Sequence, residues 1–145
     1  MKERMVRRVV IGLVIGAVSL MAAESKADGE KVFEKACASC HIKMISKPEL
    51  MKIMKTVKAP PMIEVSSQLK NNIKIVEDID DEIHRAVVIA FIKDYVDYPD
   101  LDKSMCTGAA LDRFGLMPSL KGKLSEEELN AVAAWVYDYY ADKKF

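Results

Sequence analysis

Residues 37–41 read Cys37-Ala38-Ser39-Cys40-His41, and this C-x-x-C-H string decides the fold of the 145-residue chain. Two thiols three positions apart can each form a thioether with one vinyl group of a porphyrin. The histidine that follows directly can then coordinate the iron. The string therefore predicts one covalent haem of the c type, attached through Cys37 and Cys40, with His41 as an axial ligand of the iron.

Two other uses of a C-x-x-C pair fit the sequence less well. A thioredoxin-like dithiol needs alternating strands and helices around it, and the chain shows no convincing strand pattern. A structural zinc site needs four ligands. The chain has three cysteines and two histidines, and neither Cys106 nor His84 has a partner nearby in sequence. We therefore expect haem rather than a dithiol or a zinc centre.

The first 27 residues have the pattern of a secretory signal peptide. Basic residues at the N-terminus precede an uncharged stretch at 9–23, and small residues follow it. Cleavage is expected after Ala23 or Ala27; the second site, with Ser25 at the −3 position, is favoured and leaves a single mature domain at 28–145. The stretch is shorter than the about 20 apolar residues of a membrane span, so an uncleaved anchor at 9–23 is the alternative. We expect export to a bacterial periplasm, since thioether bonds to haem are made outside the cytoplasm.

The mature domain is slightly acidic. The leader holds five of the 22 basic and two of the 22 acidic residues, which leaves residues 28–145 with a net charge of −3. The sequence therefore has no basic stripe that would indicate nucleic-acid binding. Lysines do cluster near the C-x-x-C-H string, either as a docking patch for an acidic redox partner or as a solvated loop. They are Lys43, Lys47, Lys52, Lys55 and Lys58.

Apolar periodicity predicts an all-α domain. Helices are expected at 28–36, 62–72 and 79–95, and a last helix follows Ser125, where Ser125 and Glu128 form a capping box. Residues 42–61 are expected to be mostly loop with one helical turn at 49–55, and residues 99–124 to be loop with short turns. The helix at 79–95 should bury a stripe of side chains four residues apart: Ile83, Val87, Phe91 and Tyr95. The last helix should bury Leu129, Val132, Trp135, Val136 and Tyr139.

A second iron ligand is expected on the face of the haem opposite His41. Met117 lies in Phe114-Gly115-Leu116-Met117-Pro118, where glycine and proline can hold a side chain inward off the helical path. A soft thioether sulfur would raise the reduction potential. Met117 could also be an ordinary core methionine. His84 is the main rival ligand, followed by Met62 and Met105.

Cys106 is the odd cysteine of the chain. We expect a buried thiol that packs as a small hydrophobe. A reactive free thiol or an intermolecular disulfide is the alternative.

Taken together, Gly29-x-x-x-Phe33-x-x-x-Cys37-x-x-Cys40-His41, a late Met117-Pro118 and a closing helix with Leu129 and Trp135 resemble the class I monohaem c-type cytochromes. The resemblance implies a cytochrome c-like fold whose first and last helices cross, with Gly29, Phe33 and Trp135 at the contact. It also implies a proline carbonyl that accepts the N–H of the proximal histidine. Pro60 and Pro61 are both open for that role. Residues 62–105 are longer than a minimal member of the family needs.

The resemblance also implies a function. We expect a monomeric one-electron carrier, with no catalytic residue, between a membrane oxidoreductase and an oxidase or reductase of a respiratory chain. Membrane contact is expected only if the leader stays uncleaved. Two alternatives remain: a haem subunit of an enzyme that acts on peroxide or sulfur compounds, and a haem-based sensor module.

Overall fold

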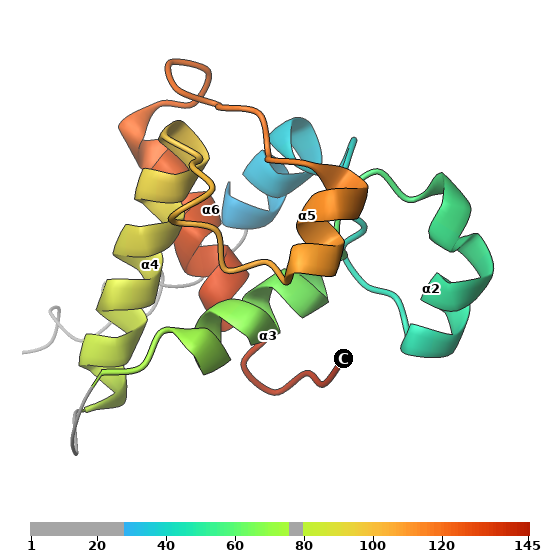
Figure 1. Ribbon diagram of the computed structural model, residues 1–145. Coiled ribbons are helices and arrows are strands. Elements are labelled where there is room, and N and C mark those ends of the chain that lie inside the picture. Colours follow the sequence, from blue (N-terminus) through green and yellow to red (C-terminus); the bar gives the residue numbers. More distant parts are fainter. Residues whose placement is uncertain (1–27, 76–79) are drawn as a thin grey trace, which may run out of the picture.

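The computed structural model describes residues 28–75 and 80–145, and the regular elements in these ranges are all helices. A first helix occupies 28–36 and runs directly into the C-x-x-C-H string. The others are α2 (Lys47–Ile53), the 3₁₀ helix η1 (Met54–Thr56), α3 (Met62–Asn72), α4 (Asp81–Asp97), α5 (Gly108–Phe114) and α6 (Glu126–Asp138) (Figure 1). The all-α prediction is confirmed. The predicted leader at 1–27 lies outside the described residues.

The first helix crosses α6 at very close range (Figure 1). A Cβ atom placed on Gly29 would lie 2.4 Å from the carbonyl oxygen of Ala131 and 2.4 Å from Cβ of Trp135. Only glycine permits such an approach of two backbones. One turn later the rings of Phe33 and Trp135 pack with their centroids 4.9 Å apart, and both side chains are buried. The expected crossing of the terminal helices is therefore present.

The long helix α4 packs along α6. Arg85 donates two hydrogen bonds, of 2.9 and 2.7 Å, to the carboxylate of Asp138. Near the other end of the pair, Lys93 lies 2.6 Å from Glu126. Between these ion pairs the side chains of Val88 and Ile92 are buried in the core. The two ion pairs thus flank an apolar seam and fix the register of the two helices.

The predicted apolar stripe of α4 is wrong at its first two positions. Ile83 and Val87 are 50% and 41% exposed, whereas Val88 and Ile92 are 1% and 7% exposed. Apolar residues on α4 follow two adjacent rows with the same spacing of four, so periodicity alone cannot select the buried row. The packing of α4 against α6 determines that the row with Val88 and Ile92 is the buried one.

Two stretches predicted to be mostly loop contain helices: the single turn expected at 49–55 is α2 followed by η1, and 99–124 contains α5. Ser46 and Glu49 form a capping box with Pro48 in the first turn, and this box starts α2. At α5, the Thr107 side chain accepts a hydrogen bond from the amide of Ala110. The predicted capping box of Ser125 and Glu128 is present at α6. In the described ranges, no helix is both long and apolar enough to cross a membrane.

Candidate functional site

The C-x-x-C-H string forms a tight turn at the end of the first helix. The amide of Cys37 donates to the carbonyl of Phe33 at 2.8 Å, and the amide of His41 donates to the carbonyl of Cys37 at 2.9 Å. These bonds continue the helical pattern through the string, so Cys37 and His41, four residues apart, point to the same side. The turn thereby presents thiol and imidazole groups together.

The imidazole of His41 is held by the backbone at Pro60. Its Nδ1 lies 2.8 Å from the Pro60 carbonyl oxygen, which can only accept, so the ring donates Nδ1–H there. The lone pair of Nε2 is then free for another partner. Burial, opposed by this hydrogen bond, lowers the pKa of His41, which favours the neutral ring. Pro61 instead precedes α3 and is buried.

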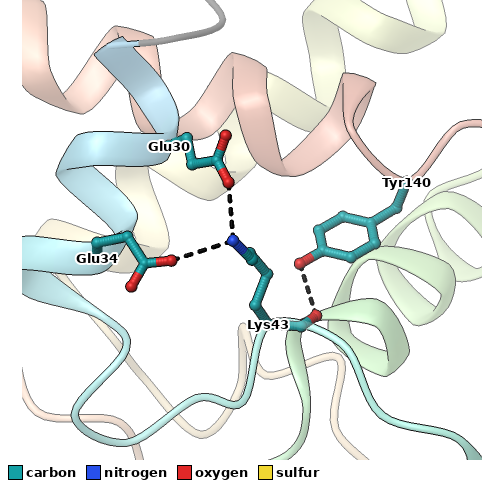
Figure 2. A network of polar contacts seen from close by, with 4 residues as sticks. All are labelled: Glu30, Glu34, Lys43 and Tyr140. Atoms are coloured by element: carbon teal, nitrogen blue, oxygen red, sulfur yellow. Dashed lines mark hydrogen bonds and ion pairs between the residues drawn. The ribbon is translucent and has the colours of Figure 1, made fainter.

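A polar network fixes the segment that follows His41 (Figure 2). The Lys43 ammonium lies 2.7 Å from Glu30 and 3.1 Å from Glu34, both on the first helix. The hydroxyl of Tyr140 donates to the carbonyl oxygen of Lys43 at 2.8 Å. These contacts raise the pKa of Lys43, mainly through the hydrogen bonds to the two carboxylates. The network joins the C-x-x-C-H turn to both terminal regions of the domain.

A largely apolar cavity brings the predicted site residues together. Cys37, Cys40 and His41 line it, as do Pro60 and Met117. Apolar side chains of α3, α4 and α6 build much of its wall: Met62, Val65, Leu69, Phe91, Ile92, Tyr95, Val96, Val132 and Val136. Pro61 and His84 do not line the cavity. The predicted site residues Cys37 and Met117, 80 positions apart in the sequence, thus line the same cavity.

The loop that carries Met117 is anchored to the C-terminal end of α4. Ser119 Oγ donates to the Asp97 carbonyl at 2.6 Å, and the amide of Leu120 donates to the Val96 carbonyl at 2.9 Å. The last carbonyls of a helix have no partner within the helix, so the loop satisfies them. On the other side of Met117, Gly115 has φ +70°, which lets the chain turn out of α5. The two hydrogen bonds to α4 and the turn at Gly115 hold Met117 in the cavity wall.

His84, the rival ligand, has other partners. Its Nε2–H donates to the Ile73 carbonyl at 2.9 Å, and its Nδ1, 2.9 Å from Tyr137 Oη, accepts from that hydroxyl. The histidine thus links α4 to the end of α3 and to α6. Both ring nitrogens of His84 are hydrogen-bonded to groups that do not line the cavity, so this histidine has a structural role.

Cys106 differs from the prediction. Its side chain is exposed rather than buried, and it lies in the cavity rim next to Met105. Met62 and Met105 also line the cavity, but Met62 follows Pro61 on the histidine side, where its amide donates to the Ile42 carbonyl.

The Cys37 thiol does not have the lowered pKa of a reactive thiolate. Burial, with a smaller effect from the neighbouring Cys40, raises the pKa of Cys37 to about 11. A dithiol redox site normally lowers that pKa. In the ranges 28–75 and 80–145, no three His, Cys, Asp or Glu side chains are grouped as metal ligands. Two thiols, a neutral imidazole and a thioether around an apolar space fit a porphyrin that brings its own iron and four nitrogens.

The cavity wall holds residues that sequence reasoning left without a role. Phe91 and Tyr95 of α4 and Leu69 of α3 line the cavity, although the first two were predicted as part of a core stripe. Ser119 does not line the cavity, but it anchors the Met117 loop to Asp97, a role that the sequence did not predict. Its only signal was a short polar side chain directly after Met117-Pro118, a type of residue that often bonds to nearby backbone.

Comparison with known proteins agrees with this geometry. A family model described as cytochrome c oxidase, cbb3-type, subunit III matches residues 24–136. An uncharacterized protein of Aquifex aeolicus (strain VF5) is 32% identical over 146 residues, covering 94% of this chain and 90% of the relative. No solved structure matches the chain. The resemblance to monohaem c-type cytochromes is thereby confirmed: the chain belongs to the cbb3-type subunit III family of cytochrome c domains, and its role is haem-based electron transfer.

Proposed function

We propose that this protein is an exported one-electron carrier with a single haem bound covalently to Cys37 and Cys40. The observation that carries the proposal is the hydrogen bond from His41 Nδ1 to the Pro60 carbonyl, made in the same cavity that Met117 enters. A histidine that coordinates a metal usually donates its second N–H in this way, which fixes the tautomer and the ring orientation. We assign Pro60, rather than Pro61, to this supporting role.

The haem would supply a one-electron Fe(III)/Fe(II) couple. His41 offers the Nε2 lone pair, and Met117 offers a soft sulfur from the loop anchored by Ser119 and Leu120. Such a sulfur favours the reduced iron and raises the potential. The apolar side chains of α3, α4 and α6 exclude water from the cavity, which further disfavours the more highly charged oxidised state. Fixed ligands keep the structural change between the two redox states small.

The physiological partner proposed here is a respiratory oxidase. The support is the description of the matched family, cytochrome c oxidase, cbb3-type, subunit III. The same description favours a second candidate function, a haem subunit that stays bound inside such a complex. Size-exclusion chromatography of the native protein from membranes separates the two: a carrier elutes alone, whereas a subunit co-elutes with its complex. A signal peptide at 1–27 and a periplasmic location belong to the proposal as well.

The proposal is tested with Met117→Ala, produced together with haem-maturation enzymes. The oxidised wild-type protein should show the weak far-red charge-transfer band of thioether ligation, and its reduced form should not bind carbon monoxide. The variant should lose the band and bind carbon monoxide. Met51→Ala is the matched control, because Met51 is 70% exposed and does not line the cavity. A band that survives in Met117→Ala but is lost in Met105→Ala or Met62→Ala would show a different ligand.

A further inference from the structure

The segment 44–58, which contains α2 and η1, is strongly basic. Its lysines are Lys47, Lys52, Lys55 and Lys58, and all four are exposed. Its one acid, Glu49, is bonded to Ser46 in the capping box. Lys43, which the sequence grouped with these lysines, is paired with the first helix instead. The segment therefore carries a local positive charge on a domain whose net charge is −3.

The same segment exposes large apolar side chains. Met44, Met51 and Ile53 are 43%, 70% and 40% exposed, and they make up three of the eight large exposed hydrophobics in the described ranges. Leu50, by contrast, is buried and anchors α2 to the domain. Lys47 lies one helical turn before Met51, on the same face of α2. Exposed apolar side chains that are rimmed by polar or charged residues mark interaction sites on soluble proteins.

The basic segment adjoins the haem cavity. Lys58 lines the cavity together with Ala59 and Pro60, whose carbonyl holds His41. Arg113 of α5 donates a hydrogen bond to the Met54 carbonyl, so the segment also contacts the helix that precedes the Met117 loop. Figure 1 shows α2 at the right of the molecule, away from α4 and α6. A partner seated on 44–58 would therefore lie beside the cavity and not behind the domain.

We propose that residues 44–58 are the docking surface for an acidic redox protein that exchanges one electron with the haem. This inference rests on the proposed function: in one direction the iron goes from Fe(II) to Fe(III) while the acceptor centre of the partner is reduced by one electron. Charge complementarity selects an acidic partner. The position beside the cavity favours a protein with its own redox centre over an anionic membrane, because a lipid surface gains nothing from nearness to the haem.

The test compares two double variants of the haem-loaded protein that change the net charge equally. Lys52→Glu with Lys55→Glu reverses two charges within the segment. Lys74→Glu with Lys123→Glu reverses two exposed lysines that follow α3 and precede α6. The probe is a small acidic blue-copper protein, oxidised, mixed with the reduced cytochrome in a stopped-flow instrument at low ionic strength. The visible spectrum and reversible reduction of every sample are recorded first.

The segment variant should lower the second-order rate constant at least about tenfold, and the difference should shrink as salt is added. The control variant should change the rate by less than about twofold. Equal slowing by both variants would show a response to net charge alone and would overturn the inference. An unchanged rate in the segment variant would also overturn it. Both outcomes leave the proposed function intact when the samples have a normal haem spectrum, whereas colourless samples refute the proposed function itself.

A lipid partner has a separate signature. Vesicles with phosphatidylglycerol are sedimented with each variant at the same ionic strength. The inference is wrong if three results occur together: the wild-type protein sediments with the vesicles, the Lys52→Glu, Lys55→Glu variant does not, and this variant reduces the copper protein at the normal rate. The segment would then bind membranes. The inference predicts little sedimentation of any variant.

Discussion

The crossing of the first helix and α6 predicts that Gly29→Ala is destabilising. The new Cβ would lie 2.4 Å from the Ala131 carbonyl oxygen and 2.4 Å from Trp135 Cβ, which is roughly 1 Å short of ordinary van der Waals contact. Neither contact can be relieved by rotating a flexible side chain. The helices must therefore separate, which loosens the packing of Phe33 against Trp135.

The magnitude follows from two opposing terms. Overpacking of a tight contact costs about 1–3 kcal/mol, while alanine in place of glycine gains about 0.5–1 kcal/mol of helix propensity. Combining the two ranges gives a net loss in the free energy of unfolding of about 0–2.5 kcal/mol, centred near about 1 kcal/mol. For a domain of this size the melting temperature should fall by about 5 °C at the centre of that range.

The assay is thermal unfolding of the haem-loaded protein, followed by far-ultraviolet circular dichroism. Gly108→Ala is the matched control, because a Cβ at Gly108 meets no atom within 4 Å. That variant should melt at or slightly above the wild-type temperature. A Gly29→Ala protein that is as stable as the Gly108→Ala protein would refute the close crossing of the terminal helices.

Three further predictions concern side chains around the site. Ser119→Ala removes the bond to the Asp97 carbonyl and costs about 1 kcal/mol. The reduced variant should bind carbon monoxide slowly, as followed by its visible spectrum, whereas the reduced wild-type protein should bind none; a variant that binds none either would mean that Ser119 does not restrain Met117. His84→Phe loses the bonds to α3 and α6 and should lower stability by about 1–3 kcal/mol in urea unfolding, but a change in the charge-transfer band would identify His84 as a ligand. Burial raises the pKa of Tyr140 above its ordinary value of 10.0, so stability should fall as the pH rises above about 10, where the unfolded chain ionises first. Tyr140→Phe should weaken that pH dependence, and an equally steep fall in the variant would assign it to other groups.

Signals between residues close in sequence, such as capping boxes, predicted where some of the helices begin. The capping box at Ser125 and Glu128 marks the start of α6 because both partners lie within one turn. The same signal is present at Ser46 and Glu49, but nearby prolines and lysines favoured a loop with one helical turn at 49–55, and the helix begins earlier, at Lys47. Pro48 in fact belongs to the first turn of α2, where it needs no hydrogen-bond partner.

Features that depend on tertiary packing could not be predicted. Ile83 and Val88 have similar side chains, and only the position of α6 decides that Val88 is buried and Ile83 exposed. The helix α5 has seven residues and none of them is buried, so its apolar pattern is too short to distinguish a helix from a loop. Cys106 is exposed because its loop lies at the cavity rim, which the residue type does not reveal.

In the candidate site, too, local features were predictable from the sequence and features that depend on tertiary structure were not. The spacing of Cys37, Cys40 and His41 is local and was predictable. The choice of Pro60 over Pro61 as the partner of His41 depends on a hydrogen bond across 19 residues, and the sequence offered both prolines. Nine methionines occur in the chain, and the neighbouring Gly115 and Pro118 singled out Met117 among them. The hydrogen bonds that anchor its loop to α4 depend on tertiary structure and could not be predicted.

The central claim is that Cys37 and Cys40 hold a haem by covalent bonds. Mass spectrometry of the denatured, purified protein tests it most directly, with Cys37→Ser, Cys40→Ser as the paired sample. The account predicts that the wild-type polypeptide keeps the added mass of one haem after denaturation in acid, and that the double variant does not. A wild-type polypeptide of unmodified mass, or one that releases its pigment into acidic acetone, would contradict it.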